Sequence, residues 1–188
     1  MSTKQALRVG IAGVGTVGGG VAQILSSNAV LLATRCGRPI ELVAVADQRG
    51  LIELETELSG HSNVAHYVDA VKMVQEESLD VVVETIGGYG VALAVSETAL
   101  ENGVSLVTAN KALLALHGER LGKVAEEKKA TIGWEAAVGG GIPCIRAMRQ
   151  GCAANNIGYA AGILNGTCNF ILTTMVRESF FFLFFLFY

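Results

Sequence analysis

The sequence LRVGIA at residues 7–12, followed at once by GVGTVG at residues 13–18, decides how this chain folds. The first stretch is short and mostly apolar, as in a buried strand, and residues 16–26 have the spacing of a helix with a small-residue face. A strand, a glycine turn and a helix in this order predict the first unit of a parallel α/β sheet.

The glycines of this turn have the spacing GxGxxG of a dinucleotide-binding loop. Gly13 allows a tight turn, Gly15 lets the backbone approach a pyrophosphate, and Gly18 lets the helix pack closely against the strand. Backbone amides near Thr16 and Val17 would then point at a phosphate, helped by the positive end of the helix. The alternative is a glycine turn with a purely structural role, and the strand and helix around it favour binding.

Strands and helices continue to alternate after this unit. The predicted elements are strands at 41–46, 64–68, 80–84, 105–108 and 130–134, and helices at 50–58, 69–77, 90–102 and 111–129. The strand at 80–84 is too apolar for a sheet edge. This order predicts a Rossmann-type, doubly wound parallel sheet, covered on both faces, as the dinucleotide-binding domain of residues 1–138.

The pattern changes after the last predicted strand. Residues 139–178 contain a glycine run, a helix that starts at Pro143 and ends near residue 154, and an extended piece at 159–164. We interpret them as the beginning of an incomplete α+β substrate and dimerisation domain. Residues 179–188 hold six of the seven phenylalanines. This tail is far shorter than the ~20 residues of a membrane helix, and we interpret it as an unselected sequence.

Charge and composition exclude several classes of partner. The 188 residues have a net charge of -3 and scattered basic residues, which argues against nucleic acid. The four cysteines form no CxxC pair, so we expect reduced, buried thiols in a cytoplasmic protein. The N-terminus leaves no room for a signal peptide before the first strand, and no membrane segment is expected. An organelle would remain possible if an upstream segment had been lost.

The run VTANK at residues 107–111 places a lysine at a strand tip. Asn110 suits a helix cap, and Lys111 would be the first residue of the helix. A partly desolvated lysine at a strand tip can polarise a carbonyl or relay a proton, so Lys111 is the candidate catalytic residue. The alternative is a solvated helix residue, although the helix dipole disfavours a cation at that end.

Other strand ends carry candidate cofactor contacts. Asp47 could bond a ribose 2'-hydroxyl, which favours NAD, or serve only as a turn residue, whereas Arg49 could pair with the 2'-phosphate of NADP. Thr85, within ETIGG at residues 84–88, and Thr108 end the neighbouring strands where a dinucleotide crosses the sheet. The alternative for ETIGG is a plain turn between a strand and a helix.

Five motifs in this order resemble homoserine dehydrogenase, over residues 7 to about 177. They are GVGTVG at 13–18, ETIGG at 84–88, VTANKALLA at 107–115, EAAVGGGIP at 135–143 and GILNGTCNFIL at 162–172. The resemblance implies NAD- or NADP-dependent interconversion of L-aspartate 4-semialdehyde and L-homoserine, a step towards threonine, methionine and isoleucine. It further implies that Lys111 lies beside both the nicotinamide and the substrate.

The resemblance also implies sites beyond the nucleotide loops. Gly166 and Thr167 would lie beside the amino-acid substrate, while the alternative is that Thr167 caps a helix starting near Asn169. A monovalent cation, Na⁺ or K⁺, would lie in the segment around the glycine run, which could also be an interdomain hinge. The implied cation ligands are Glu135, Val138, Gly140 and Ile142.

The sequence departs from the family pattern after Met175. The family's substrate carboxylates and second lysine have no counterpart, and Cys168 stands where a threonine is usual. Family members are homodimers, and most of the dimer interface is expected to be missing here. The alternatives to an active enzyme are therefore a catalytically inactive NAD(P)-binding fragment, a subunit that pairs with a complete chain, or another semialdehyde-type dehydrogenase or reductase.

Overall fold

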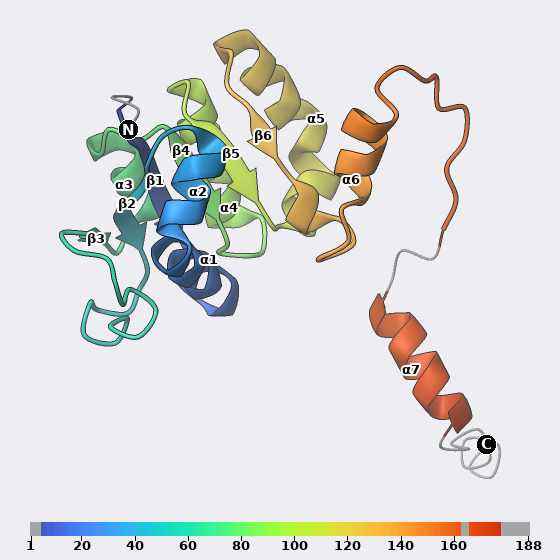
Figure 1. The fold of residues 1–188 in the computed structure, drawn as a ribbon, viewed down its shortest axis with the longest axis horizontal. Helices are drawn as coiled ribbons and strands as arrows, with labels where there is room; N and C mark the ends of the chain where they lie inside the picture. The colour runs from blue at the N-terminus through green and yellow to red at the C-terminus, as the bar shows by residue number, and fades with distance from the viewer. Residues whose placement is uncertain (1–4, 163–165, 178–188) are drawn as a thin grey trace. The chain divides into compact units, whose positions relative to one another are not determined.

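The computed structural model describes residues 5–162 and 166–177, and the chain divides into two units, Met1–Ala137 and Val138–Tyr188. The first unit is built on a parallel sheet with the strand order β3-β2-β1-β4-β5-β6 (Figure 1). The strands are β1 (Leu7–Ala12), β2 (Ile40–Ala46), β3 (Ala65–Tyr67), β4 (Val81–Glu84), β5 (Ser105–Thr108) and β6 (Ile132–Gly133). The helices of this unit are α1 (Thr16–Ser27), α2 (Ala29–Cys36), α3 (Ala70–Glu76), α4 (Gly90–Glu101), α5 (Lys111–Lys128) and the 3-10 helix η1 (Glu135–Ala137).

Strand β1 lies at the centre of the sheet. Its residue Ile11 pairs with Val45 of β2 on one side and with Val83 of β4 on the other, both in parallel register. Ile11 is fully buried, because strands joined by crossover helices are covered on both faces. The observed order confirms the predicted Rossmann-type parallel sheet and the central position of β4.

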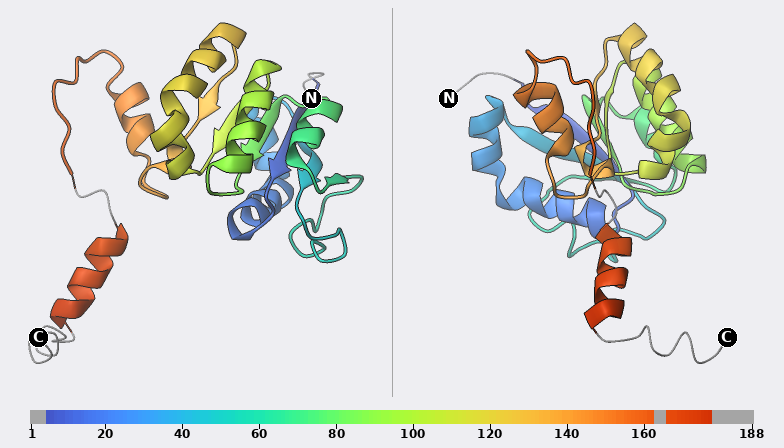
Figure 2. Two further views of the ribbon diagram at one scale, coloured as in Figure 1. Left: turned by 180° about the vertical axis from the view of Figure 1, so that it is seen from behind. Right: turned by 90° about the vertical axis from the view of Figure 1, so that its right-hand side faces the viewer.

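Helices cover the two faces unequally. Helices α3, α4 and α5 pack on one face, where Met73 and Val95 lie in one core with Val82 of the sheet. Helix α1 covers the other face with the turns that follow β2, through Ala22 and Leu54. In the side view of Figure 2, α1 and α2 lie on one side of the sheet and α4 and α5 on the other.

Helices lie on both faces of the sheet, as expected, but one residue of β5 on the α1 face is exposed. Val107 of β5 pairs with the mostly buried Val83, and so lies on the same face, yet it is 40% exposed. Helices α1 and α2, which precede β2 in the chain, lie on this side of the sheet. Val107 is therefore an exposed apolar side chain on this face of the first unit.

Two elements between β1 and β3 differ from the prediction. The short helix expected at 50–58 is wrong, because residues 51–60 form successive turns that still bury Leu54 and Leu58. Helix α2 was not predicted, and it follows α1 directly in the chain. The two helices are bent by 82° where Asn28 separates them.

The second unit contains α6 (Cys144–Arg146), the π-helix η2 (Ala147–Gly151) and α7 (Gly166–Arg177). The helix predicted to reach residue 154 therefore ends earlier, at a glycine that weakens helices. Residues 159–162 belong to no regular element, and the rest of the predicted extended piece and the phenylalanine tail lie outside the described residues. Because α7 begins at Gly166, Thr167 lies inside its first turn, and the predicted helix start near Asn169 is wrong.

The four cysteines are free thiols. Cys144 is partly buried, but the other three are exposed, so the expectation of buried thiols is wrong. Within residues 5–162 and 166–177, no single helix is long and apolar enough to cross a membrane. The bent pair α1 and α2 reaches that length and apolarity only when the two helices are taken together.

Candidate nucleotide-binding site

The turn between β1 and α1 requires glycine at its first position. Gly13 has a φ of +91°, a conformation that side chains disfavour, and its amide donates to the carbonyl of Ala46 at 2.8 Å. A Cβ atom on Gly13 would lie 2.9 Å from the backbone of Thr85 and Ile86. The turn is therefore pressed against the end of β4.

The other two glycines of the motif have opposite surroundings. A Cβ atom on Gly18 would overlap the carbonyl oxygen of Gly13 and lie 2.7 Å from the Thr85 hydroxyl. A Cβ atom on Gly15 would meet no atom within 4 Å. Gly18 thus permits close packing of α1, while Gly15 borders open space that a ligand can enter.

Helix α1 presents its positive end to this open space. It begins at Thr16, and its first turn contains no acidic residue that would neutralise the exposed amides. Thr16 and Val17 are exposed. This arrangement can bind an anion such as a pyrophosphate.

Asp47 holds the glycine turn in place. One carboxylate oxygen accepts from the amide of Val14 at 2.8 Å, and the other accepts from the Arg49 amide at 3.0 Å and its Nε at 3.1 Å. A second Arg49 nitrogen, Nη2, lies 3.3 Å from the first oxygen and donates to the Val14 carbonyl at 2.6 Å. The sequence suggested two alternative residues, and the structure joins them into one ion pair.

The charge of Asp47 is fixed by this pairing. Burial raises the pKa of Asp47, but hydrogen bonds from the Arg49 side chain and from the Arg49 and Val14 amides outweigh it and hold the pKa at about 2. Four donors occupy the carboxylate, which has about four acceptor positions. Arg49, by contrast, keeps 39% of its side chain exposed.

Acidification is expected to weaken the fold through Asp47. Its pKa is about 2 in the folded protein, against an ordinary value of 3.8. At a pH above 3.8, the ionised group therefore stabilises the fold by about 2 kcal/mol. This stabilisation is lost as the pH falls through the lower value. We expect the free energy of unfolding, measured with urea, to fall between about pH 6 and about pH 3. The fall should be smaller for Asp47→Asn than for the unmodified chain. Equal losses would contradict this role.

A cavity of about 690 Å³ opens beside the glycine turn, which is ample for part of a nucleotide. Asp47, Arg49 and Thr85, three of the predicted cofactor contacts, line it. The walls contributed by the turn after β3, by the first turn of α3 and by α4 were not predicted. They are Val68, Asp69, Ala70, Val71, Val91 and Ala94. Val68 could have been predicted, because residue 68 was the predicted end of a strand.

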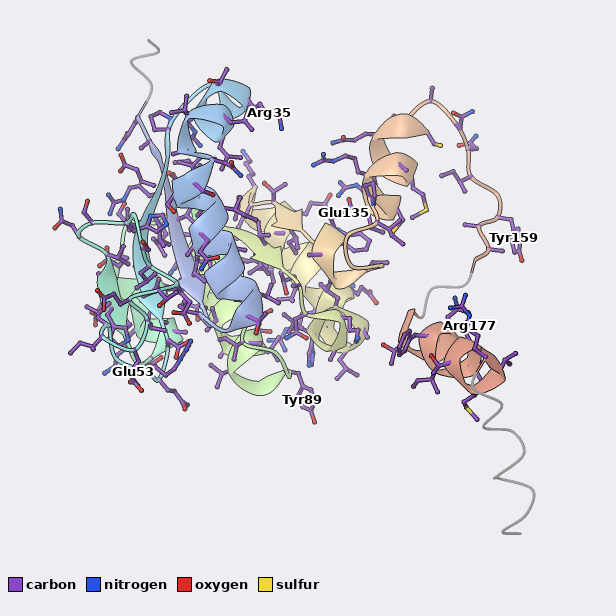
Figure 3. The ribbon with its side chains drawn as sticks, turned by 60° about the horizontal axis from the view of Figure 1, so that its bottom comes forward. Arg35, Glu53, Tyr89, Glu135, Tyr159 and Arg177 are labelled. Carbon is purple, nitrogen blue, oxygen red and sulfur yellow. The ribbon has the colours of Figure 1, made fainter. Side chains whose placement is uncertain are left out.

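A second hollow, of about 680 Å³, lies on the other side of Gly15. Arg49 lines both spaces, and Glu57 accepts from its Nη1 at 3.2 Å. Glu53, labelled in Figure 3, belongs to the turns that form the wall. The guanidinium is therefore paired with two carboxylates, those of Asp47 and Glu57.

The predicted contacts at the ends of β4 and β5 lie on adjacent strands. The Thr85 hydroxyl donates to the Gly13 carbonyl at 2.6 Å, so it ties the end of β4 to the glycine turn. Thr108 is buried on β5, opposite Glu84 in the register. Asn110 caps α5 by accepting from the Leu113 amide at 3.1 Å, which confirms the predicted cap.

Lys111 is the first residue of α5 and is exposed. The position agrees with the sequence prediction, but the partial desolvation expected for this lysine is not present. Lys111 follows the cap directly, so its backbone is fixed while its side chain is free to reach a ligand above the strand ends.

The residues implied for the cation and the substrate fall in both units. Glu135 forms part of η1 in the first unit (Figure 3), whereas the other implied residues belong to the second unit. These are Val138, Gly140, Ile142, Gly166 and Thr167. The Val138 carbonyl accepts from the Cys144 thiol at 3.5 Å, and the Ile142 carbonyl accepts from the Cys144 amide at 2.8 Å. Carbonyl oxygens are hard donors that keep a second lone pair, so their chemistry fits Na⁺ or K⁺.

Among residues 5–162 and 166–177, no group of three or more His, Cys, Asp and Glu side chains could hold a metal ion. A cation in the implied segment would therefore depend mainly on backbone oxygens.

The strand order, the glycine turn and the cavity beside it define a dinucleotide-binding protein of the Rossmann class. A family model described as "Homoserine dehydrogenase, NAD binding domain" matches residues 13–135, and one described as "Homoserine dehydrogenase" matches residues 143–183. The chain belongs to the homoserine dehydrogenase family, whose members are NAD(P)-dependent oxidoreductases.

Individual relatives agree with the family assignment. The homoserine dehydrogenases of Pseudomonas aeruginosa and Neisseria gonorrhoeae are 46% and 43% identical over 92% of this chain. A crystal structure of a homoserine dehydrogenase from Thiobacillus denitrificans covers 91% of the chain at 40% identity, with a TM-score of 0.82. A hyperthermophilic archaeal homoserine dehydrogenase in complex with NADPH covers 77% at 25% identity, with a TM-score of 0.63.

The chain spans about two fifths of the three bacterial relatives, namely 38% and 39% of the Pseudomonas and Neisseria enzymes and 39% of the Thiobacillus chain, and about half, 48%, of the archaeal chain.

Proposed function

We propose that this chain binds NAD or NADP and takes part in the interconversion of L-aspartate 4-semialdehyde and L-homoserine. The observation that carries the proposal is the open backbone at Gly15 at the positive end of α1, next to a cavity lined by Asp47, Arg49 and Thr85. Residues 1–138 would form the dinucleotide-binding domain and residues 139–178 the beginning of the substrate domain. We further propose a cytoplasmic location and a homodimeric partner, as the family resemblance implies.

Each part of the site has a distinct task in this proposal. The glycine turn and the first amides of α1, at Thr16 and Val17, bind the pyrophosphate, and Arg49 contacts the adenosine ribose. The nicotinamide, when bound, supplies or accepts the hydride exchanged with the aldehyde carbon of the substrate. Lys111 holds or polarises the substrate carbonyl at the strand ends, and the buried Thr108 lies below it at the end of β5.

A substrate-side proposal rests on the second unit. Gly166 and Thr167 start α7, and the unpaired amides of a helix start can bind the carboxylate of an amino acid. Glu135 and the carbonyls of Val138, Gly140 and Ile142 would hold a monovalent cation. Their role there is structural, because these hard oxygen donors would fix the glycine run around the ion.

Two measurements test the proposed function. Fluorescence titration of the whole chain with NADH and NADPH should give saturable binding, and a spectrophotometric assay with L-homoserine and NAD or NADP should give reduced cofactor. Failure to bind either nucleotide would overturn the proposal. Binding without turnover would instead identify a nucleotide-binding chain without catalysis.

Replacing Arg49 with alanine is expected to weaken NADPH binding by roughly tenfold or more, since a charge-assisted hydrogen bond is worth about 1.5–3 kcal/mol. NADH binding should change little, because the variant frees Asp47 to accept from a ribose hydroxyl while Asp47 and Glu57 repel a 2'-phosphate. The matched control is Arg35→Ala, an exposed arginine on α2 (Figure 3). Equal losses for both nucleotides would show that Arg49 does not discriminate between them.

A further inference from the structure

A buried carboxylate lies at the end of β4, beside the end of β5 and the start of α5. Glu84, the last residue of β4, is fully buried. One of its oxygens accepts from the Thr108 hydroxyl at 2.6 Å, and the other accepts from the amides of Ile86 at 2.9 Å and Gly87 at 3.3 Å. The Asn110 side-chain amide lies at 3.5 Å from the second oxygen.

Both oxygens of Glu84 act as hydrogen-bond acceptors in this cluster. The groups around it are donors, and the Thr108 oxygen already accepts from the Asn110 amide at 3.0 Å, so the Thr108 proton is available to Glu84. A buried polar group is costly unless hydrogen bonds replace its water. Here two backbone amides, a hydroxyl and a side-chain amide do so.

The same cluster joins the two turns that carry the site. The turn after β4 is held through Ile86 and Gly87, and its Gly88 carbonyl accepts from the Asn110 side chain at 2.5 Å. Asn110 also caps the helix that begins with Lys111. Glu84 therefore fixes the position of Lys111 relative to the turn after β4, and that turn is bound to the glycine loop through Thr85.

We propose that Glu84 is a positioning residue for the nicotinamide half of the cofactor site. Its carboxylate holds the turn after β4 and the start of α5 in one arrangement, without itself contacting the ligand. The inference rests on the proposed nucleotide-binding function. It assigns the adenosine half to a different set of contacts, those of the glycine turn, Asp47 and Arg49.

This division predicts a selective loss of affinity. Glu84→Gln keeps the volume but places an NH₂ group against donors, so at least one donor loses its acceptor. In the whole chain, the dissociation constant for NADH should rise by roughly tenfold. The dissociation constant for ADP-ribose, which lacks the nicotinamide, should stay within about twofold. Both are measurable by calorimetric titration and need no turnover.

Two further variants separate positioning from general stability. Thr108→Val also keeps the side-chain volume, and it removes the hydrogen bond of 2.6 Å to Glu84. It should therefore weaken NADH binding selectively, as Glu84→Gln does. If Glu84→Gln fails to fold, this variant provides the test. Val95→Ala opens a cavity in the core under α4, away from the cluster, and should lower the melting temperature without changing either dissociation constant.

The possible results lead to different conclusions. Equal weakening of NADH and ADP-ribose, or no weakening of either, in Glu84→Gln and Thr108→Val would overturn the positioning role alone. An unmodified chain that binds neither ligand would overturn the proposed function and this inference with it.

Discussion

Replacing Gly18 with alanine is expected to abolish tight nucleotide binding and to destabilise the fold by about 2–3 kcal/mol. The added methyl group would overlap the Gly13 carbonyl and press on the Thr85 hydroxyl. Helix α1 must then move away from the turn, and the amides that face the phosphate move with it. Calorimetric titration with NADH or NADPH should show a loss of affinity of more than about tenfold, and thermal unfolding should show the loss of stability.

Gly20 offers a matched control on the same helix. A methyl group there would meet no atom within 4 Å, so Gly20→Ala should leave nucleotide affinity unchanged. Alanine in a helix is more favourable than glycine by roughly 0.5–1 kcal/mol, and this variant should unfold at a slightly higher temperature. If both variants behaved alike, the close approach of α1 to Gly13 would not determine binding.

Replacing Lys111 with alanine is expected to lower turnover of L-homoserine by roughly 10²–10⁴-fold, the usual effect of removing a general acid or base. The side chain is exposed at the start of α5 and makes no hydrogen bond or ion pair within the described part of the chain, so its removal should leave thermal stability nearly unchanged. Steady-state rates with NAD and NADP, together with nucleotide titration, separate a loss of chemistry from a loss of binding.

The control for this experiment is another lysine of α5. Lys123 pairs with Glu119 one turn away at 2.7 Å, both largely exposed, and such pairs contribute about 0.3–0.5 kcal/mol. Lys123→Ala should therefore keep the full rate. A Lys111→Ala variant with unchanged turnover would remove Lys111 from the catalytic role and leave the strand tip as a binding surface only.

Local patterns predicted the frame of the sheet well. The strands at residues 7–12 and 105–108 were placed to the residue, because a short apolar run before a glycine turn or a helix cap leaves little freedom in position. Asn110 was recognised as a cap for the same reason. The structure between residues 50 and 60 was misread, since Leu54 and Leu58 have helical spacing although turns bury them.

Contacts between distant segments could not be predicted in this way. Asp47 was expected to face a ribose, but its oxygens are taken by Val14 and Arg49, and this depends on how β2 lies beside the glycine turn. Glu84 was recognised only as a polar residue at a strand end. Its burial follows from Thr108, which the register places opposite it on β5.

The central position of β1 has a consequence for how the chain acquires its fold during synthesis. Val9 pairs with Leu42 on one side, but its partner on the other side is Val81, which leaves the ribosome much later. Until then one edge of the innermost strand is unsatisfied, and an open apolar edge recruits strands from other chains. Nascent chains that pause before Val81 are thus the species most prone to aggregate, and a chaperone that shields strand edges would protect them.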